Sequence, residues 1–270
     1  MKNIKETLIK LSTSFPLFAV ILIILFVVIP FPILVINIFI VINLIFALWL
    51  LLLVFNNCNI SKISLFPTFL LISTVFTLAI NVSITRPILT KGSEFNDRII
   101  CTVSNIFTGT GDNIHLWVGF IFFILFLIFM IIVINKSTTR VSIVAARWTL
   151  DIMQVKMLAI EAEYSSGVIT EEQASQRKAE LIEESDFYGS LDGATKFISG
   201  NVKINIFIIF GIIFGGTAID YFINDAVLID AIKTYIRFSI GAGIVFFLPV
   251  FIIFLAAGIF VTRLASPNSN

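Results

Sequence analysis

Two aspartates stand where a carboxyl group could exchange protons at a membrane. Asp151 directly follows an apolar segment, in the sequence RWTLD, and Asp220 lies inside a second apolar segment near its end. A carboxyl group held where water is scarce can take up and release protons near neutral pH. The simpler alternative for Asp151 is a solvated helix residue close to Arg147 or Lys156. From the residues alone, that alternative is favoured.

Asp220 allows the same two interpretations. Intramembrane carboxylates are costly and often mark ion paths, but a side chain near the end of a span can also reach the membrane surface. His115 has no Cys, His or carboxylate at metal-ligand spacing, which argues against a metal site. Phosphate-binding loops, dinucleotide glycine motifs and nucleophile elbows are absent from the sequence. The sequence therefore indicates neither an enzyme nor a bound cofactor.

Small residues suggest close helix packing in the last third of the chain. Gly211 and Gly215 have GxxxG spacing, and Gly216 follows directly. Glycines at this spacing let two membrane helices approach closely. We therefore expect Gly211, Gly215 and Gly216 to pack against another helix.

The elements that must position these residues are apolar. Of the 270 residues, 58% are hydrophobic, and the net charge is +1. This composition is typical of a polytopic membrane protein, and without a basic field it does not favour nucleic acid as a partner. A spanning helix needs about 20 apolar residues. We expect an all-α protein with about six transmembrane helices, over residues 11–29, 33–55, 63–84, 114–134, 204–223 and 238–261.

The one long polar stretch, residues 147–201, holds ten of the seventeen carboxylates. Thr170 and Gln173 have capping-box spacing, which predicts the start of a helix there. Gly167 should end the preceding helix, and Gly189 should end the helix that begins after Thr170. We expect a compact helical hairpin. The predicted organisation is therefore four spans in 1–135, a helical loop in 136–203 and two spans in 204–270.

The distribution of Lys and Arg predicts the orientation of the chain. With the N-terminus inside, inner segments carry thirteen basic residues and outer segments carry five. Because cytoplasmic segments are enriched in Lys and Arg, the loop and both termini should be cytoplasmic.

The amino-acid sequence of the loop resembles that of the FHIPEP family, the large export-gate membrane proteins of bacterial type III secretion and flagellar export. The resemblance rests on RWTLD (147–151), Lys156, AIEAE (159–163), the helix from Thr170 to Glu184, DFYGSLDGATKF (186–197), two stretches of the third span, and AAGIFVTR (256–263). It implies an inner-membrane, homo-oligomeric and nonameric ring that contacts other export-apparatus membrane proteins, lipid and secreted substrates, and that helps couple proton-motive force to the passage of unfolded substrates. It assigns the coupling carboxylate to Asp151. The other matching loop positions are Arg147, Lys156, Asp186, Tyr188, Gly189, Asp192, Gly193 and Lys196.

The chain also departs from the family pattern. Thr77 replaces a family arginine, Asn201 replaces an aspartate, and Gly241-Ala242-Gly243 replaces Gly-Asp-Gly. Family members continue beyond AAGIFVTR into a large cytoplasmic domain, so we expect this chain to be the membrane half alone. The alternatives to an export-gate component are a truncated, degenerate paralogue without export activity and a stand-alone proton or ion transporter.

Overall fold

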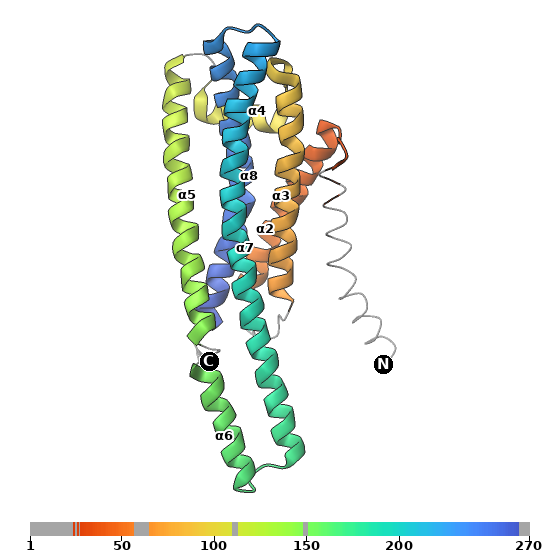
Figure 1. The fold of residues 1–270 in the computed structure, drawn as a ribbon, viewed down its shortest axis with the longest axis vertical. Helices are drawn as coiled ribbons and strands as arrows, with labels where there is room; N and C mark the ends of the chain where they lie inside the picture. Colours follow the sequence, from red (N-terminus) through yellow and green to blue (C-terminus); the bar gives the residue numbers. More distant parts are fainter. Residues whose placement is uncertain are drawn as a thin grey trace.

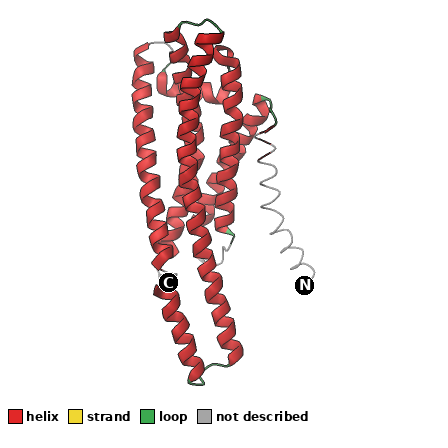
Figure 2. Ribbon diagram, viewed as in Figure 1, coloured by secondary structure: helices red, strands yellow, loops and turns green. Residues whose placement is uncertain are grey.

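The computed structural model describes residues 24, 26, 28–56, 65–109, 113–147 and 151–264, and all its regular elements are helices (Figure 2). The predicted span 11–29 lies almost wholly outside these residues. The helices are α2 (Ile33–Asn56), α3 (Phe66–Lys91), α4 (Arg98–Thr108), α5 (Asn113–Arg147), α6 (Met153–Ser165), α7 (Glu171–Ile223) and α8 (Leu228–Leu264), with a 3-10 turn η2 (Gly92–Glu94) after α3.

Five of the described helices, α2, α3, α5, α7 and α8, are long and apolar enough to cross a membrane. This agrees with the predicted all-α, polytopic class. They lie side by side in a bundle, and α6 with the first part of α7 projects from one end of it (Figure 1). The short helix α4 lies at the other end. Neither α5 nor α7 breaks at the predicted boundaries near residues 135 and 203.

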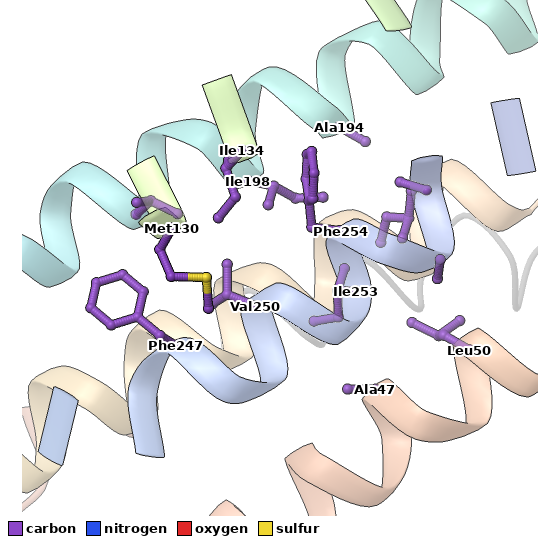
Figure 3. Close-up of a cluster of buried hydrophobic side chains, with 14 of the residues drawn as sticks. Ala47, Leu50, Met130, Ile134, Ala194, Ile198, Phe247, Val250, Ile253 and Phe254 are labelled. Atoms are coloured by element: carbon purple, nitrogen blue, oxygen red, sulfur yellow. The ribbon is translucent and has the colours of Figure 1, made fainter. Parts of the chain in front are cut away.

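The core of the bundle is a layer of aliphatic and aromatic side chains centred on α8. Phe247, Val250, Ile253 and Phe254 of α8 face α2, α5 and α7 (Figure 3). From those helices come Ala47 and Leu50, Met130 and Ile134, and Ala194 and Ile198. Side chains of this core are almost fully buried, so α8 is the helix around which the others pack.

Two glycines of α8 allow close approach to neighbouring helices. A Cβ atom on Gly241 would lie 2.3 Å from the backbone oxygen of Ile100 in α4, and one on Gly243 would lie 2.3 Å from the ring of Phe123 in α5. Such distances are too short for real atoms, so both positions need glycine. At Gly241 the backbone of α8 thus lies close to the backbone of α4, and at Gly243 it lies against the Phe123 ring of α5.

The predicted end of a helix at Gly189 is wrong. α7 continues through Gly189 and Gly193 to Ile223, and the positive-φ glycines of the described chain are Gly92, Gly109 and Gly167. A C-terminal glycine cap requires a left-handed backbone, which Gly189 does not adopt. The buried side chains of Tyr188 and Leu191 on either side hold the helix in the packed structure.

The third span is also longer than predicted. Residue 84 was its expected end, but α3 continues through Pro87 to Lys91. The segment that follows contains α4, whose buried residues Ile100, Ser104 and Thr108 recur every fourth position. That spacing places them on one helix face, which packs against the bundle.

Candidate functional site

The projecting hairpin begins as the sequence predicted. Thr170 accepts a hydrogen bond from the backbone N–H of Gln173, and the Gln173 side chain accepts one from the backbone N–H of Thr170. These reciprocal bonds form the capping box of α7. On the other side of the turn, Gly167 has φ +73°, and Val168 N–H bonds to the carbonyl of Glu163 at 3.0 Å. This is a Schellman-type end for α6, so the two helix signals meet in one tight turn.

A small apolar cluster joins the two arms of the hairpin. Ile160 of α6 packs with Leu181 and Tyr188 of α7, and Ala145 of α5 extends the cluster to the membrane bundle. Three ion pairs flank it between the arms, Lys156–Glu184 at 3.4 Å, Lys178–Glu161 at 3.1 Å, and Arg177–Glu163 at 2.5 Å. Because their side chains are largely exposed, each pair contributes about 0–1 kcal/mol. The apolar cluster is therefore the main stabilising contact of the hairpin.

Asp151 lies at the junction between the bundle and the hairpin. Its side chain is exposed, two residues before the first residue of α6. Within the described residues it forms no ion pair with Arg147 or Lys156, and Lys156 pairs with Glu184 instead. Asp151 thus has no ion-pair partner in the part of the chain that the structure describes, and its side chain is exposed at the base of the hairpin.

The other resemblance-derived loop residues divide into exposed and buried positions. Asp186, Gly189 and Gly193 are exposed on α7, whereas Tyr188 is buried in the hairpin cluster. Tyr188, Gly189 and Gly193 all lie within the continuous helix α7. The hairpin brings Tyr188 onto the α5–α6 side and leaves Asp186 at the surface.

Asp192 is the most firmly held carboxylate of the loop motif. Ser142 of α5 donates a hydrogen bond to its Oδ1, and Lys196 donates one to its Oδ2 at 2.7 Å. The side chain of Asp192 is about one-fifth exposed, and its two partners hold both of its oxygens in place. This arrangement fastens α7 to α5 just where both enter the bundle.

The bundle also contains a polar seam, which we define as Asn43, Ser73, Thr74, Thr77, Asn81, Asn201 and Asn205. Asn81 Nδ2 donates to Asn205 Oδ1 at 2.9 Å, and Asn201 Nδ2 donates to the backbone oxygen of Thr74 at 3.0 Å. Asn43 Nδ2 donates to Thr77 Oγ1 at 2.9 Å. The polar seam therefore links α2, α3 and α7 through side chains that are almost completely buried.

The polar seam was not singled out from the sequence. Its signal was present, because Asn43, Asn81 and Asn205 each interrupt an apolar span and polar groups inside spans are functional candidates. Three of its buried atoms find no hydrogen-bond partner in the described chain: Ser73 Oγ, Asn201 Oδ1 and Asn205 Nδ2. Such atoms are costly in a low-dielectric interior, so the polar seam has spare capacity to bind a small polar ligand such as water.

Asp220 is buried at the end of the bundle opposite the hairpin. Its side chain is 4% exposed, and Asn224 Nδ2 donates to its Oδ1 at 2.8 Å. A Cβ atom on Gly92, which has φ +52°, would lie 2.8 Å from Asp220 Oδ1 and 3.2 Å from the Tyr235 hydroxyl. Gly92 is therefore required both by its backbone conformation and by its contact with this carboxylate.

The predicted packing glycines behave differently from one another. Gly216 lies against Tyr235 of α8, since a Cβ atom there would be 2.2 Å from the ring. Gly211 and Gly215 have no other side chain within 4 Å of an added Cβ. In the described part of the chain there is also no cluster of three His, Cys, Asp or Glu side chains that could hold a metal ion.

The fold and these sites define a class of protein: a helical membrane bundle with one projecting helical hairpin and a buried polar seam. The FHIPEP family matches residues 23–270. The chain belongs to the FHIPEP family, which confirms the resemblance seen in the loop and span motifs.

Several curated proteins are similar to this chain. The flagellar biosynthesis proteins FlhA of Treponema pallidum and Borreliella burgdorferi are each 39% identical to it, over 96% and 90% of the chain. Invasion protein InvA of Salmonella typhimurium is 36% identical over 90% of the chain. The chain spans about a third of the length of these relatives, 36%, 35% and 35% respectively. No solved structure matches the chain significantly.

Proposed function

We propose that this chain is an inner-membrane component of a bacterial protein export gate. The main support for this proposal is the family match, which covers both the spans and the hairpin. Similarity to a flagellar biosynthesis protein and to an invasion protein supports export as the shared role. The proposal includes the passage of unfolded substrates through the gate and contacts between this chain and other membrane proteins of the apparatus.

Within that role, we propose Asp151 as the group that couples proton movement to export. It is the exposed carboxylate at the root of the hairpin, so its protonation can alter the contact between the hairpin and a partner without unfolding the bundle. Asp192 is less suited to this task, because Ser142 and Lys196 already bond to its two oxygens within the chain. The cytoplasmic location of the hairpin is part of the proposal and is supported by the excess of basic residues in the inner segments.

The test is the isosteric neutralisation Asp151→Asn in cells that lack the wild-type chain. Glu183→Gln is the matched control, since Glu183 is an exposed hairpin carboxylate outside the RWTLD motif. We expect Asp151→Asn to abolish secretion while the protein still fractionates with the membrane, and Glu183→Gln to secrete normally. Normal secretion by Asp151→Asn would contradict the coupling role.

Two further outcomes separate the alternatives. A stand-alone proton transporter would carry protons when the purified chain alone is placed in liposomes, and Asp220 would be its first candidate residue. A degenerate paralogue would give no secretion defect when the gene is deleted. The export-gate proposal predicts a secretion defect on deletion and no proton flux by the chain alone.

We also propose that the open face of α7 packs against a second copy of the chain in a ring. Gly211 and Gly215 lie on this face with exposed Phe207, Phe210 and Phe214, and no part of the described chain covers the two glycines. A glycine pair permits close approach of a neighbouring helix in lipid. Cysteines introduced at 211 and 215 should cross-link two copies, whereas a cysteine at the buried position 212 should not.

A further inference from the structure

A polar cavity lies at the end of the bundle away from the hairpin, between α4 and the first turns of α8. Its volume is about 460 Å³. The polar side chains that line it are Ser93, Asn105, Asp230, Lys233, Thr234 and Arg237. The export role proposed above does not use this cavity.

The sequence of α8 indicates where the cavity lies relative to the membrane. Arg237 is the last charged residue before residues 238–261, a run of 24 residues without charge. A helix of that length extends about 36 Å, slightly more than the roughly 30 Å of a bilayer's hydrocarbon core. Arg237 therefore lies at the level of the lipid headgroups on the side away from the hairpin.

Arg237 is half-buried, and its guanidinium has no hydrogen-bond or ion-pair partner among the described residues. Its backbone oxygen accepts a 2.7 Å hydrogen bond from Ser104 Oγ, which fixes this turn of α8 against α4. A partly desolvated arginine is stabilised by an anion that accepts hydrogen bonds from its fork of N–H groups. The position therefore calls for an external anion.

Lys233 adds a second positive charge to the same helix face, one turn before Arg237. Its Nζ atom lies 3.7 Å from the Asp230 carboxylate, at the limit of an ion pair. The Asp230 side chain is 72% exposed, whereas that of Lys233 is 28% exposed. Because the carboxylate faces water, it neutralises the partly buried ammonium group of Lys233 only weakly.

Neutral donors complete the lining. The Asn105 amide and the Ser93 hydroxyl have no hydrogen-bond partner in the described chain, and Cys101 contributes a partly buried thiol whose pKa is raised by that burial. The cavity thus combines two cations with free amide and hydroxyl donors. A tetrahedral phosphate, with several acceptor oxygens and a negative charge, matches this set of groups.

We propose that this cavity binds a phosphate group, with Arg237 and Lys233 as its main ligands. At headgroup depth, the natural source is the phosphodiester of an anionic phospholipid, and inorganic phosphate offers the same chemistry from solution. A bound headgroup would hold α4 against α8 at the outer surface of the membrane.

The test uses the full chain in nanodiscs of phosphatidylcholine, with and without phosphatidylglycerol, and in phosphatidylcholine nanodiscs with added inorganic phosphate. We expect phosphatidylglycerol to raise the Tm and to be retained in native mass spectra. Arg237→Gln should weaken retention roughly tenfold or more, the effect of losing hydrogen bonds to a charged group. Arg98→Gln is the control, because Arg98 is exposed at the same end but lines a different cavity.

Comparing the nanodiscs that contain phosphatidylglycerol with those that contain added inorganic phosphate identifies the source of the bound phosphate group. A response to inorganic phosphate in phosphatidylcholine alone would support the site with a soluble ligand. If Arg237→Gln fails to fold, Arg237→Lys and Lys233→Gln provide the comparison, with retention kept in the first and reduced in the second. The proposal is overturned if neither phosphate source alters Tm or retention, or if Arg98→Gln weakens retention as much as the cavity variants do.

Discussion

Asn81 of α3 donates a 2.9 Å hydrogen bond to Asn205 of α7, and both side chains are almost completely buried. The bond joins residues 124 positions apart in the chain. It crosses the interface between a span of the first half and a span of the second half. The pair therefore fastens together two halves that the hairpin separates in sequence.

We predict that either single substitution, Asn81→Leu or Asn205→Leu, destabilises the protein. Each leaves the partner amide buried and unpaired, at a cost of about 1–3 kcal/mol. The double variant should recover much of the loss, since it removes both polar groups. Thermal unfolding of the purified protein in detergent measures these differences. Additive destabilisation in the double variant would show that the hydrogen bond is not the source of the effect.

Asn201 and Thr77 provide a second test of the polar seam. Asn201 bonds to the carbonyl of Thr74, one turn of α3 before Thr77, so the two positions lie close together. We predict that Asn201→Asp lowers stability by about 3–5 kcal/mol by burying an unpaired carboxylate. Adding Thr77→Arg should restore part of the loss through an ion pair, as the family's Arg and Asp at these positions suggest.

Asn135→Asp is the control for this pair, because Asn135 is exposed on α5. It should change the Tm only slightly. A double variant no more stable than Asn201→Asp alone would contradict the expected pairing of the two positions.

Adjacent glycines of α7 should differ sharply in their tolerance of alanine. At Gly216 the new Cβ atom would lie 2.2 Å from Tyr235, so we expect a loss of about 1–3 kcal/mol from overpacking. At Gly215 the new atom meets no other side chain, and alanine should be neutral or slightly stabilising in the monomer. The comparison is made by thermal unfolding in detergent. Equal losses at both positions would contradict the packing of Gly216 on Tyr235.

Cys101 should react slowly with maleimides at neutral pH. Burial raises the pKa of its thiol above the ordinary value, and the thiolate is the reactive form. Labelling should accelerate as pH rises toward and beyond that pKa. In a Cys58→Ser background, Cys101 is compared with a Thr102→Cys, Cys101→Ser variant, since Thr102 is exposed on the same helix. Identical rates and pH profiles would contradict the burial of Cys101.

The apolar runs predicted the presence of the five described spanning helices, but among these helices only α2 agrees closely with its predicted bounds, 33–55. The helices α3, α5, α7 and α8 each continue beyond at least one end of the predicted run, because residues outside the apolar run extend the helix. The α6–α7 turn was also predictable, since Thr170, Gln173 and Gly167 are local signals that act over a few residues. Gly189 misled the prediction because packing of its neighbours outweighs its low helix propensity. Local signals therefore located the start of α7 and failed to locate its end.

Contacts between distant residues could not be obtained from the sequence. The resemblance identified Asp192, but its bond to Ser142 depends on how α5 and α7 cross. The pairing of Asn81 with Asn205 depends in the same way on helix order and rotation. One chain without aligned relatives gives no information about such pairs. The polar side chains were visible in the sequence, and their partners were not.

α7 is one unbroken helix of 53 residues, about 80 Å long, from the hairpin turn to Ile223. Along its length α7 contacts α5 through Asp192, α3 through Asn201 and Asn205, and α8 through Gly216. Because the helix has no break, a displacement of the hairpin would tilt or shift all of α7. A movement on one side of the membrane would then reach the other side through a single helix.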